Sequence, residues 1–220
     1  MKKKIIFLLF LFSIFSLEVR SKNKSSLLIY LHGMRKLKKN HHFKGPKGLI
    51  EIANKKGFEV LIPKAPGRCY YLSPPRLDLN CWDHIYFKDL DFIKEEIKKL
   101  EDKKGKFRKK LIVGFSNGGY FLGGALQRNL LKEFDAVGII SGGSIGKETP
   151  KEEAYFPPTF IEIAKKDKWN RPSGERLISL LNKKRGEEKL FFRFIDREHS
   201  IDQYSLESYF NWIMNHFVKF

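Results

Sequence analysis

A serine between two glycines, directly after an apolar run, is the feature of this sequence with the clearest chemical meaning. Residues 111–115 read Leu-Ile-Val-Gly-Phe, Ser116 follows, and Asn117 and Gly118 lead into an amphipathic stretch that starts at Tyr120. A strand, a glycine-flanked serine and a helix in that order predict a nucleophile elbow, a tight turn that exposes the serine hydroxyl above a sheet. Bulkier flanking residues would collide with the neighbouring strand and helix, which explains the glycines. The pattern indicates attack by a serine hydroxyl on a carbonyl carbon.

A second G-x-S-x-G match occupies residues 142–146. Only the first match is followed by a helical pattern, in which Leu122, Leu126 and Leu130 recur every four residues on one face. The second is followed by Lys-Glu-Thr-Pro-Lys-Glu-Glu, which is polar and interrupted by proline. We therefore expect Ser144 to be a loop residue beyond a strand end.

A serine hydroxyl is a poor nucleophile near neutral pH and needs a base, which a third group must orient. His199 lies four residues beyond an apolar run at 190–195, and Asp167 follows a different apolar run. A carboxylate from a separate strand can approach the outer imidazole nitrogen, which favours Asp167 as the third group. Asp196 and Asp202 are the alternatives, because both are close to His199 in sequence.

Predicted strands and helices alternate along the chain from Leu27 onward and could position these residues. Strands are predicted at 27–31, 60–62, 111–113, 136–140, 160–164 and 190–195, and helices at 48–56, 89–100, 120–131, 174–182 and from about 203. Most of the strand runs are nearly unbroken apolar stretches, as expected for strands buried on both faces of a parallel sheet. This alternation predicts an α/β fold, with a doubly wound, mostly parallel sheet of about six strands flanked by helices. Ligands of such sheets bind beyond the carboxyl ends of the strands, where the three candidate residues lie.

With Ser116, Asp167 and His199 in this chain order, the sequence resembles the α/β-hydrolase superfamily from about Leu27 to Phe220. The resemblance implies that Ser116 is the nucleophile, His199 the general base and then acid, and Asp167 the orienting carboxylate. It implies no cofactor. One departure is Ala164, at a position three residues before the acid where the superfamily commonly has glycine.

The resemblance also implies an oxyanion hole made of two backbone N–H groups. One belongs to Asn117, directly after the nucleophile. The other belongs to Met34, because His32-Gly33-Met34 resembles the His-Gly oxyanion element of the superfamily. In that arrangement His32 has a structural role and is not a base.

Cys69 and Cys81 lie in one loop, and in an exported protein this pair is predicted to form a disulfide, with two free thiols as the alternative. The same region contains Tyr70, Tyr71 and Trp82, which we expect to line an acyl or aryl pocket. The alternative is that these aromatic side chains form the loop's own small core.

Two short segments of the chain limit which members of the superfamily it resembles. Few residues precede Leu27, and the 19 residues between Ile140 and Phe160 are too few for a helical lid domain. The chain resembles compact secreted carboxylesterases, and more weakly dienelactone-hydrolase-like enzymes and esterases that cleave polyesters or feruloyl esters.

The amino terminus predicts export. Three lysines at positions 2–4 precede an apolar run over 5–17, which is too short for a membrane-spanning helix of about 20 residues. We expect a signal peptide at 1–16 and one catalytic domain at 17–220, secreted or periplasmic, with no stable membrane span after signal removal. An uncleaved membrane anchor is the alternative.

The formal net charge of +18 suggests either an anionic partner or lysines spread over all exposed faces. We favour the second interpretation and predict no nucleic-acid partner, because nucleic-acid recognition uses clustered arginine and aromatic side chains. Lys36, Lys38, Lys39, His41 and His42 form one cluster that could shape a local anionic site. No spacing predicts a metal site, since adjacent histidines do not point at one ion.

The sequence as a whole predicts an exported serine hydrolase that cleaves carboxylic esters, small or polymeric, through an acyl-enzyme intermediate. Two alternatives remain open: a peptidase or amidase using the same three residues, and a non-catalytic binder of anionic surfaces on this scaffold.

Overall fold

The fold is taken from a computed structural model that describes residues 25–36, 44–70, 73–144, 146, 155–183 and 190–216. The predicted signal peptide at 1–16 lies outside the described residues. So do Tyr71 and most of the basic cluster, from Lys38 to His42.

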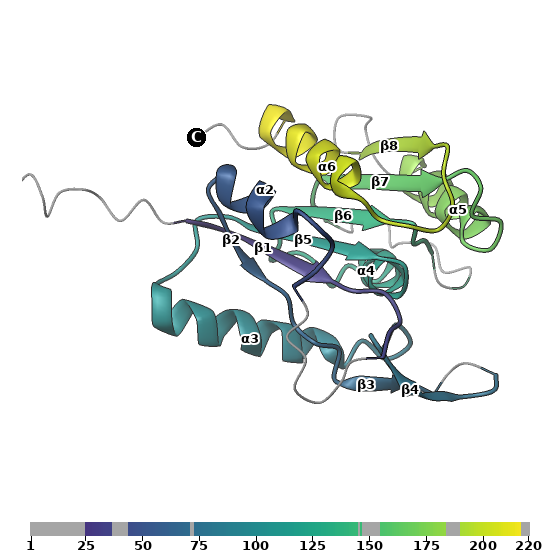
Figure 1. The fold of residues 1–220 in the computed structure, drawn as a ribbon, viewed down its shortest axis with the longest axis horizontal. Helices are drawn as coiled ribbons and strands as arrows, with labels where there is room; N and C mark the ends of the chain where they lie inside the picture. Colours follow the sequence, from purple (N-terminus) through teal and green to yellow (C-terminus); the bar gives the residue numbers. More distant parts are fainter. Residues whose placement is uncertain are drawn as a thin grey trace, which may run out of the picture.

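A six-stranded sheet forms the centre of the molecule (Figure 1). Its strands, in spatial order, are β2 (Phe58–Leu61), β1 (Ser26–Leu31), β5 (Lys110–Phe115), β6 (Ala136–Ile140), β7 (Thr159–Ala164) and β8 (Leu190–Ile195). Every neighbouring pair is parallel. The predicted α/β class and parallel sheet are therefore confirmed.

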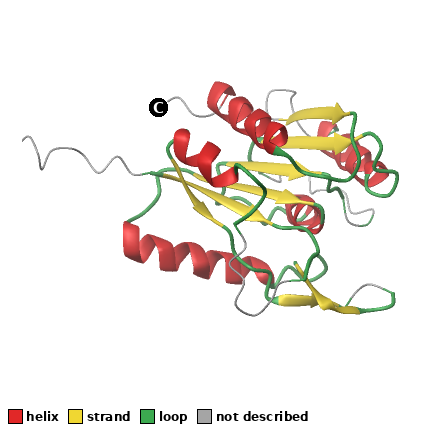
Figure 2. Cartoon of the chain, viewed as in Figure 1, coloured by secondary structure: helices red, strands yellow, loops and turns green. Residues whose placement is uncertain are grey.

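In the part of the chain that the structure describes, five helices cover the two faces of the sheet (Figure 2). They are α2 (Leu49–Lys55), α3 (Asp89–Lys104), α4 (Asn117–Gln127), α5 (Arg171–Asn182) and α6 (Gln203–His216). Apolar residues of α2 and α6 pack in one buried cluster with one face of the sheet. Those of α3, α4 and α5 pack in a second cluster on the other face. The sheet is doubly wound, as its apolar strands predict.

The strand order changes direction between β1 and β5. From β1 the chain moves outward to β2, and it then returns to β5 on the other side of β1. In open α/β sheets, such a switch point leaves a crevice beyond the strand ends where ligands bind. The loop after β1 and the turn after β5 meet there.

Three local predictions were wrong. Helix α4 ends at Gln127, and Leu130 is 37% exposed beyond it, because the chain leaves the helix through Asn129 with a positive φ of 60°. Strand β8 is not buried on both faces, since it is an edge strand and leaves Phe192 and Phe194 partly exposed. An antiparallel hairpin of β3 (Gly67–Cys69) and β4 (Arg76–Cys81) also forms where no strand was predicted.

Within the described ranges, none of the helices has the length and apolar character needed to cross a membrane.

Candidate active site

Ser116 occupies the turn between β5 and α4, at the switch point of the sheet. Its backbone has φ 53° and ψ −118°, and the side chain is almost buried. A Cβ atom on Gly114 would lie 2.4 Å from the carbonyl group of Gly118, and one on Gly118 would lie 2.4 Å from the carbonyl oxygen of Leu31. Only glycine fits at these two positions, so the steric reason predicted for both is confirmed.

The structure brings Ser116, His199 and Asp167 into one hydrogen-bonded line. His199 Nε2 lies 2.8 Å from Ser116 Oγ, and His199 Nδ1 lies 2.5 Å from Asp167 Oδ2. With its proton on Nδ1, the imidazole donates to the carboxylate and accepts from the serine hydroxyl. The ring of Phe115 stacks on the imidazole with 5.0 Å between ring centroids, which limits how far that ring can turn.

The two alternative carboxylates face other partners. Asp196 lies 3.4 Å from the Lys166 ammonium group, and Asp202 pairs with Arg197 at 2.9 Å. Asp202 also accepts a hydrogen bond from the backbone N–H of Ser205 in the first turn of α6. Asp167 is thus the one of the three that contacts His199.

The loop after β1 passes directly against the turn that holds Ser116. A Cβ atom on Gly33 would lie 3.0 Å from the Cβ of Ser116, so Met34, the next residue, is adjacent to the same turn. His32 is buried beneath the loop, where its Nδ1 lies 2.6 Å from the carbonyl oxygen of Gly33 and its Nε2 accepts from the Ala65 N–H at 3.1 Å. Burial lowers the pKa of His32 from 6.5 to about 4, although the hydrogen bond to Gly33 opposes the change. The His32 ring is therefore neutral at neutral pH and ties this loop to residue 65.

No protein-family model matches the chain, and no curated protein matches its sequence. Solved structures do match its fold. The structure of YahD with malic acid aligns with a TM-score of 0.62 at 15% identity, over 88% of this chain and 95% of that one. Esterase PE8 aligns with a TM-score of 0.57 at 18% identity, over 87% and 93% of the two chains. The Bacillus cereus carboxylesterase gives 0.56 at 16% identity, over 88% and 89%.

The chain has the α/β-hydrolase fold. The strand order, the serine turn after β5 and the nearly full-length alignments all agree on this point. At sequence identities below 20%, structural similarity shows the fold alone, and the reaction has to be inferred from the residues of the site.

Asn170 is a residue of this α/β-hydrolase site that the sequence analysis missed. Its side-chain Nδ2 donates to both carboxylate oxygens of Asp167 at 2.9 Å, and its backbone N–H donates to Asp167 Oδ1 at 3.1 Å. Its Oδ1 accepts a hydrogen bond from the Tyr120 hydroxyl at 3.0 Å. The available signal was an asparagine just before a helix start that contains proline, a typical N-cap pattern. Asn170 does occupy the N-cap of α5, but its side chain makes no capping bond.

The predicted role of Trp82 in a substrate pocket is wrong. Its side chain is fully buried, and its indole N–H donates to the carbonyl oxygen of His32 at 3.0 Å. A large aromatic ring gains more from burial in the core than from a place on an open cleft. Tyr70 lies on the hairpin with 67% of its side chain exposed. Tyr71 is outside the described residues.

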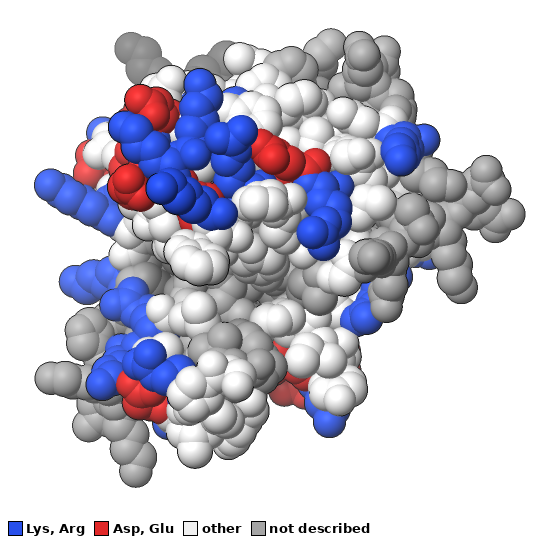
Figure 3. All heavy atoms as spheres, turned by 90° about the vertical axis from the view of Figure 1, so that its right-hand side faces the viewer, with Lys and Arg blue, Asp and Glu red and all other residues white. Residues whose placement is uncertain are grey.

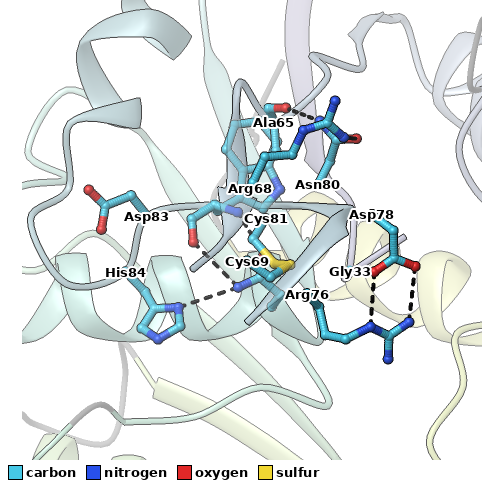
Figure 4. The surroundings of a disulfide bond; sticks show 12 residues. Gly33, Ala65, Arg68, Cys69, Arg76, Asp78, Asn80, Cys81, Asp83 and His84 are labelled. Carbon is cyan, nitrogen blue, oxygen red and sulfur yellow. Dashed lines mark hydrogen bonds and ion pairs between the residues drawn. A yellow bond between two sulfur atoms is a disulfide. The ribbon is translucent and has the colours of Figure 1, made fainter. Parts of the chain in front are cut away.

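Cys69 and Cys81 form a disulfide that joins β3 to β4, as predicted, and the free-thiol alternative is wrong (Figure 4). The hairpin reaches the site through Asn80, whose backbone N–H donates to the Arg35 carbonyl at 2.9 Å. The Asn80 side chain donates to the Ala65 carbonyl at 3.0 Å. At the end of β4, the Trp82 N–H donates to Asn117 Oδ1 at 2.7 Å. The disulfide-bonded hairpin therefore braces both the loop after β1 and the turn that holds Ser116.

A cavity of about 470 Å³ lies beside these groups and is lined in part by Gly33, Met34 and Phe115.

Figure 3 shows the face at the carboxyl ends of the strands, where lysine and arginine side chains gather with acidic side chains among them. Among the residues that the structure describes, no cluster of three or more His, Cys, Asp or Glu could hold a metal ion.

Proposed function

We propose that this protein is a serine hydrolase that cleaves carboxylic esters. The observation that carries the proposal is the line from Ser116 through His199 to Asp167, with contacts of 2.8 and 2.5 Å, over a strained serine turn. A strained backbone at a residue with a base in hydrogen-bond reach is typical of an activated nucleophile. The esterase and carboxylesterase among the aligned structures support the same reaction class.

In the first half of the reaction, Ser116 Oγ attacks the carbonyl carbon while its proton moves to His199 Nε2. Asp167 stabilises the imidazolium that forms, without taking the proton itself. The backbone N–H groups of Asn117 and Met34 hold the developing oxyanion. The alcohol leaves with the proton from His199, and an acyl group remains on Ser116.

In the second half, His199 accepts a proton from water, and the resulting hydroxide attacks the acyl carbonyl. The carboxylic acid leaves, and the hydroxyl of Ser116 recovers its proton from the imidazolium. This cycle needs no cofactor, because serine, histidine and aspartate supply every proton transfer and the only covalent intermediate.

A fluorophosphonate probe and 4-nitrophenyl acetate test the proposal. Wild type should be labelled, and Ser116→Ala should lose labelling and lower kcat by about 10⁴-fold or more. Ser144→Ala is the matched control, since Ser144 lies in the other G-x-S-x-G sequence and contacts Ser173 instead of the site. No labelling of wild type, or equal labelling of Ser116→Ala, would reject the proposal. The 4-nitroanilide of the same acid tests the amidase alternative.

We also propose that the protein is exported. The lysine-rich start, the apolar run over 5–17 and the Cys69–Cys81 disulfide support this, since such bonds persist in oxidising compartments. The mass of the protein recovered outside the cytoplasm should lack residues 1–16. A full-length mass, found only in the membrane fraction, would favour the uncleaved anchor.

A further inference from the structure

We propose that the cavity beside Ser116 binds an anionic group of the substrate through Arg35 and Lys47, so that the enzyme prefers esters bearing a carboxylate. This inference rests on the proposed function and specifies its substrate class.

The cavity borders the groups proposed for catalysis through Gly33 and Phe115, while Ser116 and His199 are not themselves among its lining residues. Four segments line it: the end of β1 with the loop behind it, the turn before α2, Phe115 and Ile201. Phe115 immediately precedes Ser116 and stacks on the His199 ring. Gly33 packs against Ser116. A ligand in the cavity would therefore lie next to both the nucleophile and the base.

The charge of the cavity lining is one-sided. Among the described residues that line it, Arg35 and Lys47 are cationic and none is acidic. The positive charge of Arg35 also acts on the buried ring beneath the loop, where it adds to the effect of burial in lowering the pKa of His32. At a concave surface lined by charges of one sign, such a field favours an anion. A guanidinium can also bind a carboxylate through two parallel hydrogen bonds.

The position of Arg35 is fixed by the fold. Its backbone forms an isolated β-bridge with Asn80, through N–H···O bonds of 2.9 and 3.4 Å. Asn80 precedes Cys81, whose disulfide closes the hairpin. These backbone bonds fix where the Arg35 Cα lies relative to the cavity, from which its side chain reaches the lining. Lys47 lies in the turn before α2, is exposed and acts as a point charge at the cavity edge.

The remaining lining matches a short carbon chain. Tyr30, Met34, Phe115 and Ile201 contribute apolar surface to the same cavity. The shape and charge together fit an ester with a short aliphatic spacer that ends in a carboxylate. The carboxylate belongs either to the acyl part or to the alcohol part of that ester.

Two substrate pairs test the inference and distinguish these two parts. Ethyl hydrogen succinate is compared with ethyl 4-methylpentanoate, which replaces the acyl-side carboxylate by an isopropyl group. On the alcohol side, 4-acetoxybutanoate is compared with 4-methylpentyl acetate. Proton release in a pH-stat at low ionic strength yields the ratio of kcat/KM for the anionic ester to kcat/KM for the neutral one.

Wild type should favour the anionic ester in at least one pair. In the double variant Arg35→Gln/Lys47→Gln, the ratio for that pair should fall about tenfold or more, mainly through KM. The matched control is Lys103→Gln/Lys106→Gln, which removes two exposed charges near the end of α3. This control should keep the wild-type ratio. About 0.5 M NaCl should lower the ratio in wild type and have little effect in the cavity variant.

A ratio of one or less in both pairs would overturn the inference. So would an unchanged ratio in a folded cavity variant. If that variant does not fold, the single variant Lys47→Gln tests the inference, because Lys47 is exposed and its substitution should not disturb folding. In Lys47→Gln the ratio of kcat/KM for the anionic ester to that for the neutral ester should fall about threefold. Wild-type turnover of neutral esters that is lost in Ser116→Ala would leave the proposed function intact even if the preference for anions fails.

Discussion

The amide of Asn170 binds Asp167 in a geometry that leaves the carboxylate little freedom to rotate. One Nδ2 group donates to both oxygens, and the backbone N–H adds a third hydrogen bond. The Tyr120 hydroxyl orients the amide from the other side. Because the carboxylate in turn orients the His199 ring, Asn170 is a positioning residue that acts through Asp167.

Replacing Asn170 should therefore slow the chemical step more than it weakens substrate binding. We expect Asn170→Ala to lower kcat for 4-nitrophenyl acetate about 10- to 100-fold, with KM within about twofold, because a small displacement of a catalytic group is costly. Tyr120→Phe removes the hydroxyl that donates to Asn170 and also contacts Ser173, and it should lower kcat a few-fold. Steady-state kinetics measures both effects.

Asn211→Ala on the exposed face of α6 is the control and should match wild type. A kcat unchanged in Asn170→Ala would contradict the positioning role. A rise in KM with constant kcat would do the same, because it would indicate a binding role instead.

In the turn between β5 and α4, close packing forces an unusual backbone conformation on Ser116. A Cβ atom on Gly114 would clash with the first turn of α4, and one on Gly118 would clash with Leu31 of β1, so neither position has room for a side chain. The second G-x-S-x-G sequence also packs closely, since a Cβ atom on Gly142 would lie 2.6 Å from the backbone of Gly119. There, however, the Ser144 N–H and hydroxyl contact the carbonyl oxygen of Ser173, so the same motif joins a loop to α5.

Gly118→Ala should destabilise the protein by about 3 kcal/mol or more, because the clash is with the backbone of β1 and no side chain can move aside. Gly57→Ala is the control. Gly57 has a φ of 78° but open space around it, so its substitution should cost about 1–2 kcal/mol from backbone strain alone. Urea unfolding measures both free energies. Equal losses in the two variants would show that the close approach to β1 is not limiting.

Across the whole molecule, the hairpin of β3 and β4 links distant parts of the chain around the site. Asn80 joins it to Arg35 and Ala65, and the residue after β4, Trp82, joins it to Asn117. The Cys69–Cys81 disulfide closes the loop that makes these contacts.

Removing the disulfide should lower stability by about 3 kcal/mol, the chain-entropy cost expected for a loop with a sequence separation of 12. We expect Cys69→Ala/Cys81→Ala to unfold at a lower urea concentration than wild type. A thiol reductant should shift wild type to the same midpoint and leave the variant unchanged. If oxidised wild type and the variant unfold together, the disulfide contributes nothing to stability.

Much of this fold follows from signals that are local in the sequence. Mostly apolar runs predicted all six strands of the sheet, because a strand buried on both faces has few polar positions, although β8 is an edge strand. The positions of Ser116, Asp167 and His199, each beyond a strand, predicted that they would meet, because parallel strands end at one edge of the sheet. The steric role of Gly114 was predictable because its clash with Gly118 lies within the turn itself, whereas the clash at Gly118 is with Leu31 of β1.

Tertiary contacts decided the rest. Strand β3 has only three residues and no pattern of its own, and the alternating residues of β4 become a strand by pairing with it beside the disulfide. The burial of Trp82, the hydrogen bonds of Asn170 to Asp167 and the place of Arg35 in the cavity each depend on residues distant in sequence. A side chain's type and spacing determine what it can do, whereas its partners are set by packing between elements, which no local pattern contains.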